Sequence, residues 1–136
     1  GSGDLHTQLC SHTLEPWDAP ACTGDALRVL PAATRHQSLG DDAWHMYVLS
    51  VSCVSADFCT ATVFVDGLEL KQTDVSGLVL GGVPHPGADS GVLGGSSDLG
   101  EAQFYGGLIA HFELVAGEAY SAQWVQAEWD NTYRTG

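Results

Sequence analysis

Residues 44–71 read WHMYVLSVSCVSADFCTATVFVDGLELK, and this stretch decides the fold. Trp44 to Ser52 contains no Gly or Pro and is rich in aromatic and β-branched residues, which predicts a central β-strand. Ala61 to Val65 predicts a second strand. Asp66-Gly67 predicts a tight turn, because Gly accepts a positive φ without steric cost. Leu68 to Lys71 should then return as a third strand.

Four cysteines, Cys10, Cys22, Cys53 and Cys59, stand at spacings that match no zinc pattern, so disulfides are the better interpretation. Three connectivities are possible, and the local pairs Cys10–Cys22 and Cys53–Cys59 are preferred on proximity. A Cys53–Cys59 bond would clamp the loop between the first two predicted strands. Because disulfides persist in oxidising compartments, we expect a secreted protein, extracellular or at the cell surface. Four reduced thiols in a cytosolic protein are the alternative.

The rest of the chain continues with short apolar runs bounded by Gly, Pro, Asp and Ser, a pattern typical of an antiparallel sandwich or barrel. Gly107 to Leu114 predicts a longer strand whose even-numbered side chains, from Leu108 to Leu114, face the core. Ser121 to Trp129 predicts the one helix, with Ser121 as N-cap. Weaker strand signals lie at residues 6–10, 27–30, 34–39, 78–80 and 92–95.

The composition fits one domain, because 136 residues can bury roughly two-thirds of the unfolded surface around one core. The chain carries 17 Asp and Glu against 4 Lys and Arg, a net charge of -13, which makes nucleic acid and anionic membranes poor partners. The sequence contains no run of about 18 apolar residues, so it predicts no membrane-spanning helix. Divalent cations and neutral ligands such as sugars remain open, although solubility alone is the preferred explanation of the acidity.

The motifs also follow a familiar order. Trp44-His45 opens a strand, Val63-Phe64-Val65-Asp66-Gly67 closes a hairpin, and Leu93-Gly94-Gly95-Ser96-Ser97-Asp98 precedes Phe104-Tyr105-Gly106-Gly107-Leu108-Ile109 and the terminal helix. This order resembles the laminin-G-like (pentraxin-like) jelly-roll domains of the concanavalin A-like lectin/glucanase superfamily, over about Leu39 to Tyr133. The resemblance implies an all-β, two-sheet antiparallel jelly-roll sandwich with one short C-terminal helix.

That fold would make residues 1–136 a single domain that is abbreviated at its N-terminal side. In the family several strands that complete both sheets usually precede the tryptophan-histidine strand, whereas here only some forty residues precede Trp44. Two explanations stay open. Short strands pinned by Cys10–Cys22 complete both sheets, or a neighbouring chain or domain covers an open sheet edge.

The resemblance also raises calcium as a ligand. In pentraxins the segment corresponding to Ser96-Ser97-Asp98 supplies calcium ligands, and here only Asp98 keeps a carboxylate. Asp98 and Glu101 are therefore the candidate calcium ligands, with Asp89 and loop carbonyls as further oxygens. Since calcium takes six to eight oxygens, solvated loop residues are the preferred reading of both carboxylates.

Catalysis has no positive support in the sequence. The paired acids that glycoside hydrolysis requires are missing from the predicted strands, and Glu128 and Asp130 fall at the end of the helix. The six histidines lack the spacing of a helical metal site. We therefore expect a protein that is not an enzyme.

The expected function is a non-catalytic extracellular recognition module that binds glycan or protein through jelly-roll loops. The candidate ligand-binding residues lie in Pro- or Gly-rich loops: Trp17, His85, Asp89 and Tyr105. Trp44 is instead assigned to the core and Trp124 to docking the helix. The alternative function is a structural subunit or domain of a surface filament, adhesin, sheath or capsid.

Overall fold

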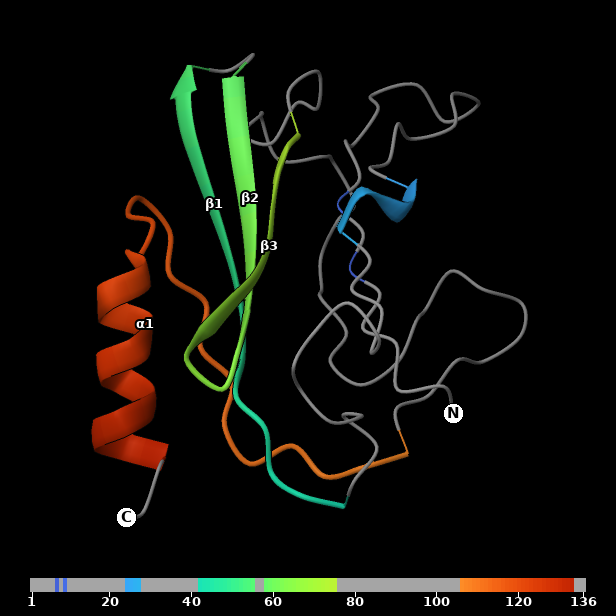
Figure 1. The fold of residues 1–136 in the computed structure, drawn as a ribbon, viewed down its shortest axis with the longest axis vertical. Helices are drawn as coiled ribbons and strands as arrows, with labels where there is room; N and C mark the ends of the chain where they lie inside the picture. The colour runs from blue at the N-terminus through green and yellow to red at the C-terminus, as the bar shows by residue number, and fades with distance from the viewer. Residues whose placement is uncertain are drawn as a thin grey trace, which may run out of the picture.

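The computed structural model describes residues 7, 9, 24–27, 42–55, 58–75 and 106–133. Three antiparallel strands form one sheet, and a short helix lies beside it (Figure 1). The elements in chain order are the 3-10 helix η1 (Gly24–Leu27), strands β1 (Tyr47–Ser55), β2 (Phe58–Val65) and β3 (Leu68–Asp74), helix α1 (Ala122–Glu128) and the π-helix η3 (Trp129–Tyr133).

The strand order β1-β2-β3 is a simple meander, as residues 44–71 predict. Among the described strands the middle one is β2, and the Trp44–Ser52 run contributes β1 beside it. Ala61, Val63 and Val65 are buried on one face of β2, and Thr62 and Phe64 are buried on the other. Because its polar residues are only threonines, β2 can be covered on both faces, whereas the serines of β1 suit an outer position.

The turn between β2 and β3 forms at Asp66-Gly67 as predicted, with φ values of 53° and 81° at the two residues. Positive φ at both central positions is the geometry of the hairpin turn that matches the twist of its strands. The Asp66 N–H also donates to the Met46 carbonyl at 2.9 Å, which attaches the turn to the residues just before β1.

The core lies on the face of the sheet that carries the odd-numbered residues of β2. Cys59, Ala61 and Val63 pack there with Val75 and with Leu27 of η1, and Leu9 and Leu49 are among the partly buried residues around them. Leu27 ends a 3-10 turn, so the strand predicted to begin at residue 27 is wrong at that residue. The 3-10 turn still contributes to the core, because it places the fully buried side chain of Leu27 against the sheet.

Helix α1 lies beside the same sheet and contacts β3 (Figure 1). The predicted N-cap is confirmed, because the Ser121 hydroxyl accepts the Trp124 N–H at 3.2 Å. The residue that docks the helix is Val125, which is fully buried, and not Trp124, which is 39% exposed and stacks on Tyr120. The Ser50 hydroxyl donates to the Tyr120 carbonyl at 3.3 Å and so ties β1 to the start of the helix.

Trp129 ties the end of the helical region to the hairpin. A Cβ atom added to Gly67 would lie 2.9 Å from the Trp129 Cβ, so the ring rests against the backbone of the turn. Only a glycine allows this approach.

Two predictions about the core are wrong. Trp44 is 62% exposed, because the strand begins only at Tyr47 and Trp44 precedes the paired region. Gly107 to Leu114 forms no strand, and Leu108, Phe112 and Leu114 are exposed. The alternating pattern remains, but the described strands do not include a partner for it.

The described residues thus establish a three-stranded antiparallel sheet with one short C-terminal helix. The strands predicted over residues 34–39, 78–80 and 92–95 lie outside the described residues. Within the described part of the chain, no helix has the length and apolar character needed to cross a bilayer.

Candidate binding surface

The described surface is most apolar along residues 107–117, a stretch called here the apolar segment. It runs as a coil below the sheet and then toward the start of α1 (Figure 1). The largest exposures along it are 76% at Leu108, 62% at Phe112 and 84% at Leu114. Ile109 and Val115 are also exposed, by 47% and 40%. Single exposed apolar residues are ordinary, but five within eight positions mark an interaction surface.

Strand-forming composition without a ladder explains this exposure. A β-strand has to satisfy its backbone groups through a neighbouring strand, and the ladders of the described sheet join only β1 to β2 and β2 to β3. The segment therefore has the periodicity of a strand and no partner among the described strands.

The apolar segment carries two groups able to form ion pairs, and it has no Lys or Arg. The His111 Nε2 lies 3.4 Å from the Glu113 Oε2, with the two side chains 59% and 54% exposed. At this exposure the pair contributes little to stability. It does place a donor and an acceptor side by side on the same surface.

A second exposed apolar site lies at the β1–β2 hairpin end. The predicted Cys53–Cys59 disulfide is confirmed, with an S–S distance of 2.02 Å, and it joins two residues that are directly opposed in the ladder. A register shift between Cys53 and Ser55 sets Val54 outside the regular pairing, and Val54 is 96% exposed. Phe58, at the start of β2, is 67% exposed. The disulfide keeps this apolar end closed.

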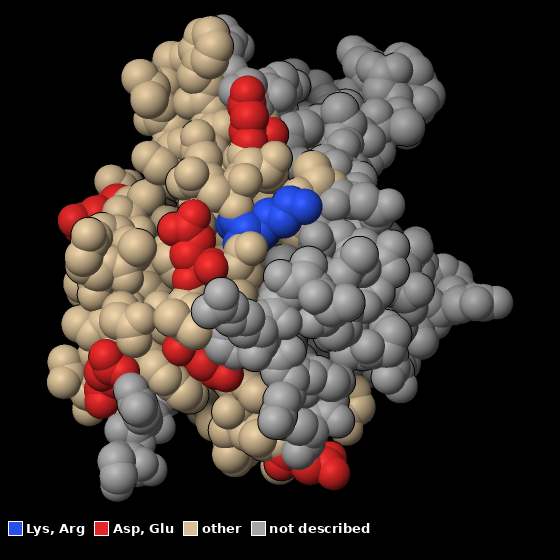
Figure 2. Space-filling view, viewed as in Figure 1, with Lys and Arg blue, Asp and Glu red and all other residues tan. Residues whose placement is uncertain are grey.

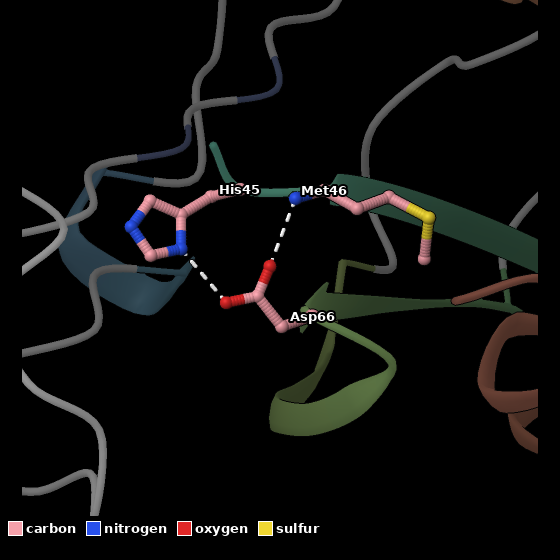
Figure 3. Close-up of polar contacts among 3 residues, drawn as sticks. All are labelled: His45, Met46 and Asp66. Carbon is pink, nitrogen blue, oxygen red and sulfur yellow. Dashed lines mark hydrogen bonds and ion pairs between the residues drawn. The ribbon is translucent and has the colours of Figure 1, made fainter. Parts of the chain in front are cut away.

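The polar cluster around Asp66 is structural (Figure 3). One carboxylate oxygen lies 2.7 Å from the His45 Nδ1, and the other accepts the Met46 N–H at 2.9 Å. His45 and Asp66 are 21 residues apart in the chain, so the contact depends on the completed hairpin. Both oxygens hold the β2–β3 turn to the residues before β1, so the His45–Asp66 contact has a structural role.

Tyr47, the first residue of β1, is linked to the N-terminal part of the chain. Its hydroxyl lies 2.7 Å from the Thr7 Oγ1. Although Tyr47 is 44% exposed, the partial burial of its phenol raises the pKa above the ordinary value of 10.0, while the hydrogen bond to Thr7 works in the opposite direction.

The charges on the described surface fit no anionic ligand. Acidic side chains are scattered over the face in Figure 2, and Lys71 is the only basic residue among those described. Within that same set, no three His, Cys, Asp or Glu residues gather as metal ligands. A hollow runs along one side of α1, and its lining includes a single possible metal ligand, Asp130. The hollow is lined by Ala122, Gln123, Gln126, Ala127 and Asp130.

The ligand-binding residues predicted from the sequence, Trp17, His85, Asp89 and Tyr105, lie outside the described residues. So do the candidate calcium ligands Asp98 and Glu101 and the cysteines Cys10 and Cys22. These predictions stay predictions. No family model, curated protein or solved structure matches the chain. Its function therefore has to be argued from its own surface.

Proposed function

We propose that this chain is a non-catalytic recognition module that works outside the cell and binds a protein through the apolar segment. The single observation that carries the proposal is the exposure of Leu108, Phe112 and Leu114 in one continuous stretch. A monomer gains nothing from keeping such side chains in water, whereas a protein interface gains from burying them.

The chemistry of the segment favours a protein over a glycan. Sugar sites rely on Trp and Tyr platforms with polar side chains around them, and the apolar segment offers Leu, Ile and Val around one Phe. Trp44 and Tyr47 are exposed by 62% and 44% and are the described aromatics best suited to a sugar. They are not part of the apolar segment, so a glycan would use a different region from a protein partner.

The secreted location, the jelly roll and the laminin-G likeness belong to the same proposal. The Cys53–Cys59 disulfide supports an oxidising compartment. The β1-β2-β3 meander with a helix against it would be one part of the larger sandwich. In that fold the apolar segment would lie at the interface with the bound protein.

A second candidate function, a structural subunit of a surface assembly, is favoured by one specific observation. The apolar segment alternates like a strand although it is unpaired in the described sheet. Strand addition between subunits is a common way for such segments to become ordered.

The proposal is tested by photocrosslinking from within the segment. A photoreactive phenylalanine analogue replaces Leu114, and the matched control carries the same analogue at Gln123, which is exposed on α1. Each variant is irradiated in the extracellular fraction of its host, and products are identified by mass spectrometry. We expect a defined protein adduct from position 114 and none from position 123.

A glycan panel read by tryptophan fluorescence provides the opposing outcome. If position 114 yields no adduct while panel members shift the fluorescence, the module binds sugar and the proposal is wrong. Equal labelling from positions 114 and 123 would also contradict it, because the reaction would then be non-specific.

A further inference from the structure

The apolar segment is complementary to itself when two copies run antiparallel. We propose that residues 108–116 of one chain pair as a β-strand with residues 108–116 of a second copy, about a two-fold axis through Phe112. This inference rests on the proposed function, since it names the partner of the same surface.

The register follows from the residue types. With Phe112 opposite Phe112 of the second copy, His111 lies opposite Glu113, and Glu113 lies opposite His111. Directly opposed side chains in an antiparallel pair share one face and lie close enough to interact. The imidazole N–H of each copy then donates to the Glu113 carboxylate of the other copy in place of the Glu113 of its own chain, so one exposed contact within each chain is exchanged for two equivalent contacts between chains. A shift by one residue would place His111 opposite Phe112 and lose both contacts.

The apolar residues match in the same register. Ile109 lies opposite Val115 on the face that carries the His and Glu groups, and Ala110 lies opposite Leu114 on the other face. That other face is apolar along its whole length in both copies, with Leu108, Ala110, Phe112, Leu114 and Ala116. Pairing thus joins two exposed apolar faces into one continuous face that can be covered on association.

The ends of the segment also fit. Gly107 lies opposite Gly117, so flexible residues bound the paired region on both sides in both copies. Gly117 has a φ of 92°, a conformation that a strand does not use, and it therefore marks where the ladder must stop. A two-fold axis requires each surface patch to be its own complement, and this sequence satisfies that condition from end to end.

Charge explains why the pairing depends on this segment. Each copy has a net charge of -13, so two copies repel each other over most of their surface. Between Gly107 and Gly117 the only acidic group is Glu113, and the register provides it with His111 of the second copy. A second copy therefore meets the least repulsion where it meets the most apolar area.

The test is sedimentation equilibrium of the purified full chain over a wide concentration range. We expect a monomer–dimer equilibrium. Glu113→Lys should weaken dimerisation about tenfold, because a lysine offers no acceptor to the opposing imidazole N–H. The double variant His111→Glu, Glu113→Lys restores an acid opposite a base in the same register. It should dimerise within a few-fold of the parent chain.

Crosslinking provides a second readout of the register. With the photoreactive analogue at Leu114, the dimer should yield an intermolecular adduct that maps to the neighbourhood of Ala110. Circular dichroism confirms that each variant keeps the parent fold, which is expected because both substituted positions are exposed.

The inference is overturned if the parent chain stays monomeric at all concentrations, or if the charge-swapped double variant dimerises as poorly as Glu113→Lys. The two proposals fail separately. A monomeric chain whose position 114 captures a different protein disproves the second copy and keeps the recognition module. A monomeric chain without any specific adduct disproves both.

Discussion

The middle strand of the sheet and the apolar segment are both apolar in sequence, but the first is mostly buried and the second is exposed. Residues 58–65 and 107–115 are both rich in apolar side chains, yet Val63 and Val65 are buried whereas Leu108 and Leu114 are more than three-quarters exposed. The difference lies in the pairing of the described strands. β2 has a disulfide at one end and the Asp66-Gly67 turn at the other, and each brings a partner strand alongside. Strand composition alone does not provide a partner.

The comparison is tested most directly by making the same substitution in the core and in the apolar segment. Leu27→Ala empties a fully buried position in the core and should lower the free energy of unfolding by about 2–5 kcal/mol. Leu114→Ala removes a side chain that is 84% exposed and should change it by less than about 0.5 kcal/mol. Urea denaturation of dilute protein measures both values. A large loss from Leu114→Ala would mean that the apolar segment is part of the folded core.

The same two regions can be compared through the backbone, because each contains a glycine with positive φ. Gly117→Ala in the apolar segment meets nothing within 4 Å and should cost about 1 kcal/mol, from its φ of 92° alone. Gly67→Ala, with φ at 81°, also drives a Cβ to within 2.9 Å of Trp129 and should cost about 2–3 kcal/mol. Thermal unfolding of the two variants tests the order. Equal losses would show that Trp129 does not restrain the turn.

The smallest expected effect concerns pH. The folded chain raises the pKa of Tyr47, so above pH 10 the folded state holds a proton that the unfolded state has released. The free energy of unfolding should therefore fall as the pH rises beyond the ordinary tyrosine pKa of about 10. Tyr47→Phe cannot titrate and should show a shallower decline. Parallel slopes for the two proteins in alkaline urea titrations would contradict the assignment.

The sheet was predictable because its information is local. The Asp66-Gly67 turn, the spacing of Cys53 and Cys59 and the serine N-cap of α1 each act within a few residues, and each is confirmed. Contacts between distant residues were not predictable in the same way. The His45–Asp66 contact and the packing of Trp129 on Gly67 join residues brought together only by the completed fold.

The candidate site was predicted less well, for a related reason. Periodicity assigns the residues of the apolar segment to two faces, but it does not tell whether the apolar face meets the core or solvent, and the segment forms no strand. Trp44 was misplaced in the same way, since an aromatic residue at the start of a strand is assigned to the core by type. The loop residues proposed as ligand contacts, from Trp17 to Glu101, depend on parts of the chain outside the described residues.

The contact between Trp129 and Gly67 has a consequence for biosynthesis. The β1–β2–β3 hairpins can close within microseconds of leaving the ribosome, since their turns are local. Trp129 emerges 62 residues after Gly67, which at about 5–20 residues per second is a delay of roughly 3–12 s. During that interval the turn and the helix-facing side of the sheet lack their cover. A nascent chain of this protein therefore exposes two apolar surfaces in succession, first the sheet and then the apolar segment, and chaperones would meet them in that order.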